Sequence, residues 1–388
     1  MKKKRWLLMA LALILLLPLW MWLAWLFSPK TKLVAAIVDK TVLTQQGQEH
    51  LSFTWILNHK RLTKTRRKSY NAASDYFGFF PLRDEKFRLK GLERFSTAQL
   101  QQLSADADLV YVTDTYGIYK NEWFSGKANT ERSGMLYGGM SDNDVKLLAN
   151  MKAKHKLVVA EFNSIASPTP AGVRSRFEQL FGMHWTGWTA RYFDSFDTLL
   201  NKELPHWLTA GYKREHGGKW PFHRPGVAFV NDGGRVAILE DSTHLTDPMP
   251  HIMSLAYGQK QLGLPPRIKY PFWFDVLAPD LAVNHVISRF DIAANKNGRA
   301  ELAKYGIPAT FPAVLMHRGD DYRFYYFSGD FCDNPINFTT SYFKGIGFFK
   351  FLFYNTGDPA ERGSFFWTFY QPLMNHILDE EVQRKNRL

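Results

Sequence analysis

The sequence contains one cysteine, Cys332, in 388 residues. A single thiol excludes an intramolecular disulfide and any zinc site built from several cysteines. Other chemical signatures are also missing: the His-Glu-x-x-His pair of zinc sites, the Gly-x-Ser-x-Gly turn of serine hydrolases, and the third glycine of a dinucleotide-binding loop after Gly345 and Gly347. The sequence therefore predicts no metal site, no nucleotide and no other cofactor.

Internal repeats and low-complexity segments are absent as well. The composition, 45% hydrophobic and 22% charged, is that of a folded globular protein, which excludes a disordered chain, a coiled coil and a collagen-like repeat. A chain of this length buries well over half of the surface that its unfolded form exposes. We therefore expect one compact unit that needs no disulfide or metal to fold.

Positive charge is in excess, with a net charge of +13, but much of the excess is confined to two places. Four of these charges lie at residues 2–5 and six at residues 60–68. A groove that follows nucleic acid needs basic residues spread along it, so this distribution argues against nucleic acid as a partner. The stretch 60–68 is either a solvated loop or a patch that contacts anionic headgroups or an acidic envelope polymer.

The basic residues 2–5 precede an uncharged apolar run at 6–27, which as a helix would span about 33 Å, enough to cross a bilayer. A cleaved signal peptide is one interpretation and a retained signal anchor is the other. The length of the run, the tryptophans near its end and the lack of a small-residue cleavage site favour the anchor. The prediction is a cytoplasmic tail at 1–5, a single transmembrane anchor at 6–27, and a domain at 30–388 outside the cytoplasm.

Short apolar runs alternate with helical patterns in the first half of this domain. The runs at 33–38, 108–113 and 156–160 are apolar on both faces, as in central strands of a parallel sheet. Helical patterns at 142–151 and 170–181 begin with capping signals and carry apolar residues at helical spacing. This alternation predicts an α/β fold with a doubly wound, mostly parallel sheet.

The second half of the chain has a different pattern. Turn signals between apolar runs predict hairpins at 226–239 and 313–327, and a last helix is expected at about 365–382. The segments 200–225 and 241–310 are rich in proline, glycine and histidine, so we interpret them as insertions or covering loops.

Three segments carry a family resemblance: YGGMS at 137–141 opening a helix, KLVVAE at 156–161, and a helix ending in LFG at 180–182. The pattern resembles the flavodoxin-like, class I glutamine amidotransferase-like fold. Its most similar variants are the trehalose-utilisation-type domain and the trimerisation domain of family 42 β-galactosidases. The resemblance implies a fold but no amidotransferase activity, because the turn at 161–164, where the family carries its nucleophilic cysteine, reads EFNS.

Candidate site residues follow from the position of the strands. Ligands of open α/β sheets bind outside the carboxyl ends of the strands, so polar residues there are expected to converge. Carboxylates that are buried together acquire shifted pKa values and can act as general acid and base. The alternative is that they cap helices or form ion pairs. The predicted catalytic residues are Asp39, Asp114 and Glu161, and the predicted ligand-binding residues are Lys40, Tyr116, Asn163 and Arg191.

Two functions are consistent with this site. Carboxylates, an amide and the nearby Trp185 and Trp188 are the groups with which proteins bind sugars, although core packing also accounts for many tryptophans. One hypothesis is a membrane-anchored binding or accessory protein for a glycan or envelope component. The other is a carboxylate-dependent hydrolase of an extracytoplasmic carbohydrate. Convergence of Asp39, Asp114 and Glu161 in one pocket would favour the hydrolase, and their separation the binding protein.

Overall fold

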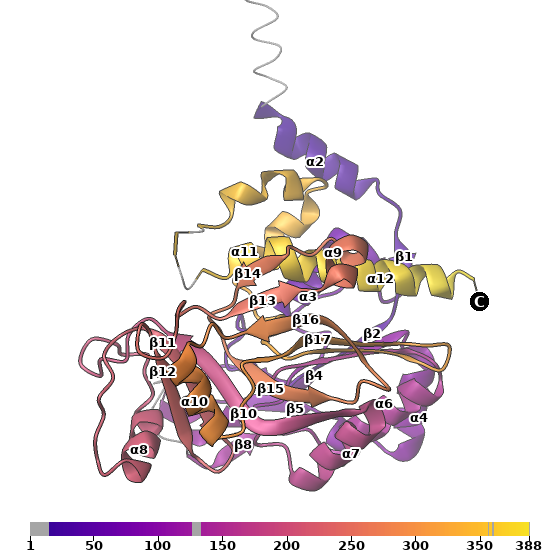
Figure 1. Ribbon diagram of the computed structural model, residues 1–388. Coiled ribbons are helices and arrows are strands. Elements are labelled where there is room, and N and C mark those ends of the chain that lie inside the picture. The colour runs from indigo at the N-terminus through magenta and orange to yellow at the C-terminus, as the bar shows by residue number, and fades with distance from the viewer. Residues whose placement is uncertain (1–14, 126–132, 356, 359–360, 388) are drawn as a thin grey trace, which may run out of the picture.

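The computed structural model describes residues 15–125, 133–355, 357–358 and 361–387. Within these residues a ten-stranded sheet crosses the molecule (Figure 1). Its five central strands run parallel, in the spatial order β4-β2-β6-β9-β18. Their bounds are β2 Ala35–Asp39, β4 Phe77–Pro81, β6 Leu109–Asp114, β9 Leu157–Glu161 and β18 Arg323–Phe327.

When the five parallel strands are numbered along the chain, their spatial order is 2-1-3-4-5, which is the order of a flavodoxin-like sheet. The predicted doubly wound, flavodoxin-like core is therefore confirmed. The order also creates a switch point between β2 and β6, where the chain reverses its direction of travel across the sheet.

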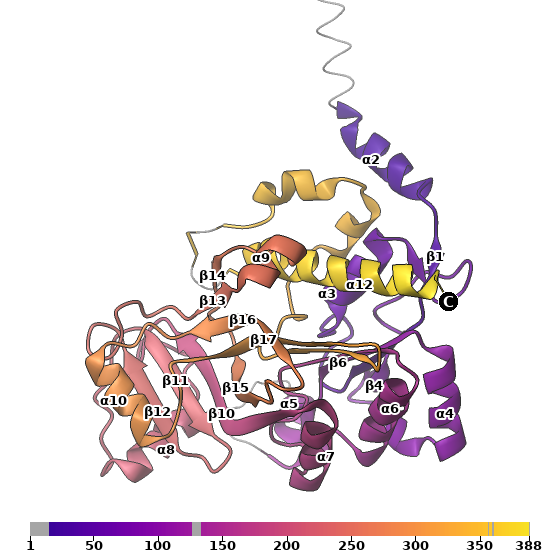
Figure 2. The same cartoon turned by 45° about the vertical axis from the view of Figure 1, so that its right-hand side comes forward.

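Helices cover both faces of the parallel core, because side chains alternate between the faces along each strand. On one face Val110 and Val112 of β6 pack with α4, α6 and α7. On the other, Leu109 and Tyr111 pack with α3 and α12. Figure 2 shows α4, α6 and α7 on one side of the sheet and α12 with α3 on the other. The bounds are α3 Leu51–His59, α4 Thr97–Asp106, α6 Asp142–Ala153, α7 Ala171–Phe181 and α12 Gln371–Lys385.

Antiparallel strands extend the sheet at both edges, so the sheet as a whole is mixed. One edge carries β5 (Phe87–Lys90). The other edge is built from the later part of the chain, and the segment 241–310, which we expected to be an insertion, supplies strands to it. The bounds of these strands are β13 His251–Ser254, β14 Arg267–Lys269, β16 His285–Asp291 and β17 Thr310–Arg318.

A separate four-stranded antiparallel sheet, in the order β12-β11-β10-β15, packs beside the core. It contains the predicted hairpin of 226–239, with Val230 opposite Val236. The second predicted hairpin, β17 and β18, is also confirmed, with Leu315 opposite Tyr326. The bounds here are β10 Met183–Phe193, β11 Gly226–Asn231, β12 Val236–Glu240 and β15 Phe274–Pro279, with helix α8 (His206–Glu215) against this sheet.

The remaining elements are short. The last helix begins with α11 and a π-helical turn before α12, close to the predicted 365–382. The bounds are β1 Thr31–Lys32, β3 Leu62–Thr63, β7 Ile118–Tyr119, β8 Met135–Tyr137, α5 Lys120–Ser125, α9 Ala256–Leu262, α10 Lys296–Lys304, α11 Gly363–Phe365 and the π-turn Phe366–Tyr370. Three 3-10 helices are η1 Leu92–Arg94, η2 Phe338–Tyr342 and η3 Ile346–Leu352.

The predicted anchor at 6–27 is described only in part, since residues 6–14 lie outside the described residues. The described part forms α2 (Leu17–Leu26), which rises away from the domain in Figure 1. Among the residues that the structure describes, no helix has the length and apolar character needed to cross a membrane. The base of α2 is tied to the domain, because the Trp25 indole nitrogen donates a hydrogen bond to the Asn58 carbonyl at 3.0 Å.

Candidate functional site

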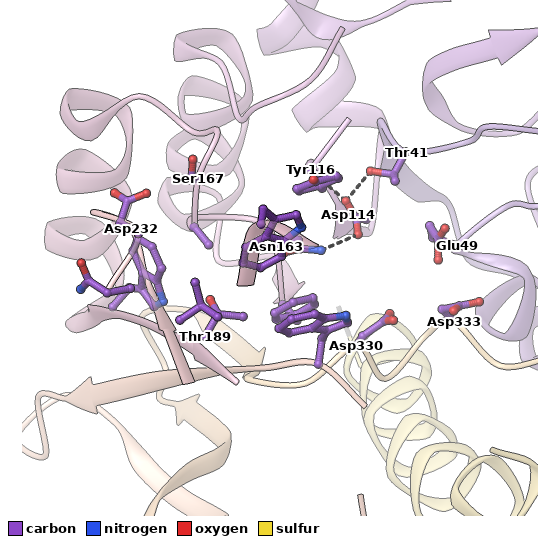
Figure 3. Close-up of a pocket in the computed structure, with 18 of the residues that line it drawn as sticks. Thr41, Glu49, Asp114, Tyr116, Asn163, Ser167, Thr189, Asp232, Asp330 and Asp333 are labelled. Atoms are coloured by element: carbon purple, nitrogen blue, oxygen red, sulfur yellow. Dashed lines mark hydrogen bonds between the residues drawn. The ribbon is translucent and has the colours of Figure 1, made fainter. Parts of the chain in front are cut away.

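A pocket of about 540 Å³ lies at the carboxyl ends of the parallel strands, between them and the four-stranded sheet (Figure 3). Thr41, Asp114 and Asn163 follow or end β2, β6 and β9 and line one side. This is the switch point of the sheet, where the open α/β architecture places ligands, and the volume is in the range of small-molecule sites.

Asp114 is held in place by three donors. The Thr41 hydroxyl and the Tyr116 backbone nitrogen both donate to Oδ1, the latter at 2.6 Å. The Asn163 amide donates to Oδ2 at 3.1 Å. Figure 3 shows the side chains of Thr41 and Asn163 turned toward the Asp114 carboxylate. Asp114 is thus a positioned carboxyl group at the centre of one pocket wall, and its partners come from three different strand ends.

Three further carboxyl groups, those of Glu49, Asp330 and Asp333, gather on the side of the pocket shown at the right of Figure 3. Their oxygens lie within 4.8 Å of one another. Glu49 precedes α3, and the two aspartates follow β18. The Arg362 guanidinium balances part of this negative charge, donating to Asp333 at 2.6 Å and to the Asp330 carboxylate at 3.1 Å.

The protonation of these groups differs from that of exposed carboxylates. Burial raises the pKa of Asp114 to about 8, against the opposing effect of the Thr41 and Asn163 donors. Burial also raises the pKa of Asp330 to about 6, with Arg362 opposing it. Burial and the Asp333 and Asp330 charges hold the pKa of Glu49 well above its ordinary value. At neutral pH the pocket therefore contains a protonated Asp114 and a mostly ionised Asp330.

Aromatic side chains form the wall across from the strand ends. Trp185 of β10, Trp207 of α8 and Trp273, which precedes β15, all line the pocket. The Arg174 guanidinium lies 4.7 Å from the Trp185 ring centre. Polar groups of the same wall include Asp232, whose carboxylate pairs with Arg174 at 3.5 Å. The pocket thus combines carboxyl groups on one side with indole rings on the other.

Asn163 occupies the turn after β9 with a left-handed backbone, at φ 63°. Asparagine tolerates this conformation better than most residues. The turn directs its side chain to Asp114, and the Thr115 hydroxyl donates to its carbonyl at 3.0 Å. The left-handed position of this turn is thus an amide that binds a carboxyl group.

Of the seven residues predicted from the sequence, the structure brings Asp114, Tyr116 and Asn163 together in the pocket. Glu161 lies elsewhere, fully buried between the sheet and its helices. The Tyr111 hydroxyl donates to it at 2.7 Å and the Cys332 backbone nitrogen at 3.2 Å. Burial, followed by the charge of Asp330, raises the pKa of Glu161 well above its ordinary value, which favours the neutral acid inside the core.

Asp39 and Lys40 point to opposite faces of the sheet. The Asp39 carboxylate contacts His50 Nδ1 at 2.6 Å on the α3 side. The Lys40 ammonium is fully buried on the α6 side, where it donates to Asp144 at 2.6 Å and to Glu93. Asp39 thus binds a buried imidazole, and Lys40 forms an internal ion pair, the alternative that the sequence left open. Neither residue is among those that line the pocket.

Arg191 lies on β10 next to the pocket wall. Its guanidinium pairs with Glu203 at 2.6 Å and lies 5.9 Å from the ring centre of Trp273. It therefore supports a pocket tryptophan from outside the lining. Asp39, Asp114 and Glu161 do not share one pocket, which is the arrangement that favours a binding protein.

Sequence reasoning missed five residues of the pocket lining: Glu49, Trp207, Trp273, Asp330 and Asp333. A signal for Asp330 was present, because it follows a strand end as Asp114 does. Glu49 and Asp333 reach the pocket through loops of the core, whereas Trp207 of α8 and Trp273 before β15 belong to the part of the chain that forms the second sheet. Glu49, Asp330 and Asp333 are also the residues that could hold a divalent cation, since carboxylate oxygens suit such ions.

No protein-family model matches the chain, and no curated protein matches it either. Solved structures with some likeness include a cytoplasmic protein of Salmonella typhimurium LT2 (10% identity, TM-score 0.35, covering 90% of this chain and 99% of that one). A putative ThuA-like protein from Bacteroides uniformis shares 11% identity at a TM-score of 0.31, over 81% of this chain and 89% of that one. A β-galactosidase from Bacillus circulans shares 9% identity at a TM-score of 0.28, over 59% of this chain. The chain spans only 22% of the length of that β-galactosidase. Likeness at this level carries no conclusion about function.

Proposed function

We propose that the pocket binds a carbohydrate, and that the protein presents this pocket outside the cytoplasm while held at the membrane by residues 6–27. The observation that carries the proposal is the joining of Asp114, Asn163 and the acidic cluster with three tryptophans in one cavity. Carboxyl and amide groups exchange hydrogen bonds with sugar hydroxyls, and indole rings stack on the apolar faces of sugar rings.

Binding can be tested with the purified full-length chain on a glycan array, followed by calorimetry with the glycans that it retains. Trp273→Ala should weaken binding at least tenfold, equivalent to about 1.4 kcal/mol. Trp123→Ala is the matched control, because Trp123 is also half-buried but packs on Phe79 and Phe87, outside the pocket. Equal loss of affinity in both variants, or no retained glycan, would contradict the proposal.

A hydrolase is the second candidate, supported by the different protonation states of Asp114 and Asp330. A protonated carboxyl and an ionised one in the same pocket are the general acid and general base that glycoside hydrolysis requires. Hydrolysis would show a bell-shaped pH profile. The rate would fall below about pH 6, where Asp330 takes up a proton, and above about pH 8, where Asp114 loses its proton.

One assay distinguishes the hydrolase from the binding protein. Release of reducing ends from retained glycans should be abolished by Asp114→Asn if the protein is a hydrolase, with binding preserved. Retention of a glycan without any release, from pH 5 to pH 9, would leave the binding protein.

Membrane attachment has its own test. A reporter enzyme that is active only outside the cytoplasm, fused after Leu388, should be active and should stay with the membranes through alkaline carbonate extraction. A reporter released in soluble form without the first 28 residues would favour a cleaved signal peptide instead.

A further inference from the structure

The 3-10 helix η3 presents large apolar side chains to solvent. Phe348 is 86% exposed, Phe351 63% and Leu352 67%, whereas Ile346 is the buried residue of this helix. Neighbouring apolar side chains at this level of exposure are uncommon on soluble surfaces and mark contact sites for a protein, a ligand or a membrane. The residues around η3 indicate which of these three contacts it makes.

The segment before η3 is attached to α2. The Lys344 backbone nitrogen donates to the Met21 carbonyl at 3.0 Å, and the Tyr342 ring packs edge-on against Trp25 with ring centres 5.0 Å apart. In both Figure 1 and Figure 2 the gold segment that holds η2 and η3 lies at the same end of the molecule as the indigo α2. The exposed phenylalanines thus neighbour the apolar run that we propose as the anchor.

The level of this attachment along α2 is informative. Met21 lies six residues before Phe27, the last residue of the proposed anchor, which corresponds to about 9 Å along a helix. Its neighbours Trp20 and Trp22 are exposed, and tryptophans of membrane anchors concentrate at the bilayer interface. Apolar faces of interfacial helices enter a membrane to a similar depth, about 5–10 Å. The link at Met21 therefore brings η3 to the depth at which such a helix contacts lipid.

Positive charge lies around the same end. The Lys30 ammonium, four residues beyond the end of α2, donates to the Arg67 carbonyl at 3.0 Å, and Thr31 pairs with Leu62, which lies within the basic stretch 60–68. Arg66, Arg67, Lys68 and Lys344 are exposed there. Basic residues beside an apolar surface are complementary to the headgroups of an anionic bilayer.

From these observations we infer that the side chains of Phe348, Phe351 and Leu352 form a lipid-contacting surface, which inserts into the interface of an anionic bilayer beside α2. The inference rests on the proposed anchor for the orientation of the chain. The contact would hold the domain against the membrane at a second point and so fix the direction in which the carbohydrate pocket faces.

The single buried cysteine makes a direct test possible. Cys332 is 0% exposed, so in a Phe351→Cys variant of the full-length chain an environment-sensitive nitrobenzoxadiazole label reacts at the introduced thiol. After reconstitution into vesicles of phosphatidylethanolamine and phosphatidylglycerol, we expect blue-shifted emission that brominated lipids quench. The matched control is Leu200→Cys, at a 76% exposed leucine between β10 and α8. Its label should keep, after reconstitution, the emission wavelength of a label in water. Adding Phe348→Asp to the Phe351→Cys variant should abolish the shift.

Each outcome separates the surface from the anchor. An unquenched label on protein that resists carbonate extraction overturns the lipid-contacting surface and leaves the anchor standing. A quenched label on protein that carbonate removes supports the surface and overturns the anchor. A blue shift without quenching by brominated lipids overturns the surface, because it shows that the label lies in an apolar environment other than lipid.

Discussion

Replacing Asp114 with asparagine should change the free energy of unfolding in opposite directions at acidic and at neutral pH. The Asp114 side chain is almost fully buried, and burial raises its pKa from 3.8 to about 8. A carboxyl whose pKa is higher in the folded state binds a proton that the unfolded chain releases above pH 4. Stability is therefore fully present below pH 4 and falls by about 1.4 kcal/mol per pH unit until about pH 8.

Asparagine is neutral at every pH, so the variant escapes this cost. At pH 7, about three pH units above the ordinary pKa, the wild type has lost on the order of 4 kcal/mol to keep Asp114 protonated. The introduced asparagine opposes part of this gain, because its amide group faces the Asn163 amide nitrogen, which donates to Asp114 in the wild type. The Asn163 amide must rotate so that its oxygen accepts a hydrogen bond instead, at a cost of about 1 kcal/mol. We expect a variant that is about 3 kcal/mol more stable than wild type at pH 7 and about 1 kcal/mol less stable at pH 4.

Urea unfolding followed by circular dichroism, at several values between pH 4 and pH 8, measures this difference. Asp232→Asn is the control, because that carboxylate is partly exposed at the pocket wall and pairs with Arg174. It should lose at most about 1 kcal/mol at any pH, as exposed ion pairs do. A variant at Asp114 that is destabilised equally at pH 4 and pH 7 would refute the reasoning, since it would mean that the carboxylate is ionised and held by its donors.

Three further predictions use the same unfolding assay or thermal melting. Lys40→Met should lower the free energy of unfolding by about 3–5 kcal/mol, because it leaves the buried Asp144 without its cation; a loss below 1 kcal/mol would contradict the ion pair. Glu161→Gln should leave the melting temperature unchanged or raise it at pH 7, since burial raises the pKa of Glu161 and so favours a neutral side chain there, and a clear fall would show an ionised, paired carboxylate. Ser141→Ala should cost about 1 kcal/mol, because the Ser141 hydroxyl caps α6; an unchanged midpoint in urea would count against the cap.

The position of the pocket could be predicted from the sequence because it depends on local patterns. Apolar runs that are buried on both faces identify parallel strands, and parallel strands end at one edge of the sheet. That rule led to Asp114, Tyr116 and Asn163, which do line the pocket. The same rule, applied to the strand that ends at Phe327, would also have led to Asp330.

The rule failed for three residues because side chains alternate along a strand. Asp39 shares the face of Ile37, and Glu161 that of Val159, so both project toward α3 and α12. Lys40 shares the face of Val38 and projects toward α6. Being at the right end of the sheet was not sufficient, since the face decides whether a charged group meets the pocket or an internal partner.

The sequence by itself determined the α/β class, the doubly wound core, both hairpins and the edge at which a site forms, since each depends on neighbours within a few residues or on the periodicity and alternation of the elements. Only the tertiary structure decided the composition of the pocket. Glu49 and Asp333 reach it through loops, and Trp207 and Trp273 through a second sheet whose packing on the core no local pattern encodes. The pKa values that make the pocket chemically interesting depend on this assembly as well, because desolvation exists only once these distant segments have closed around the carboxyl groups.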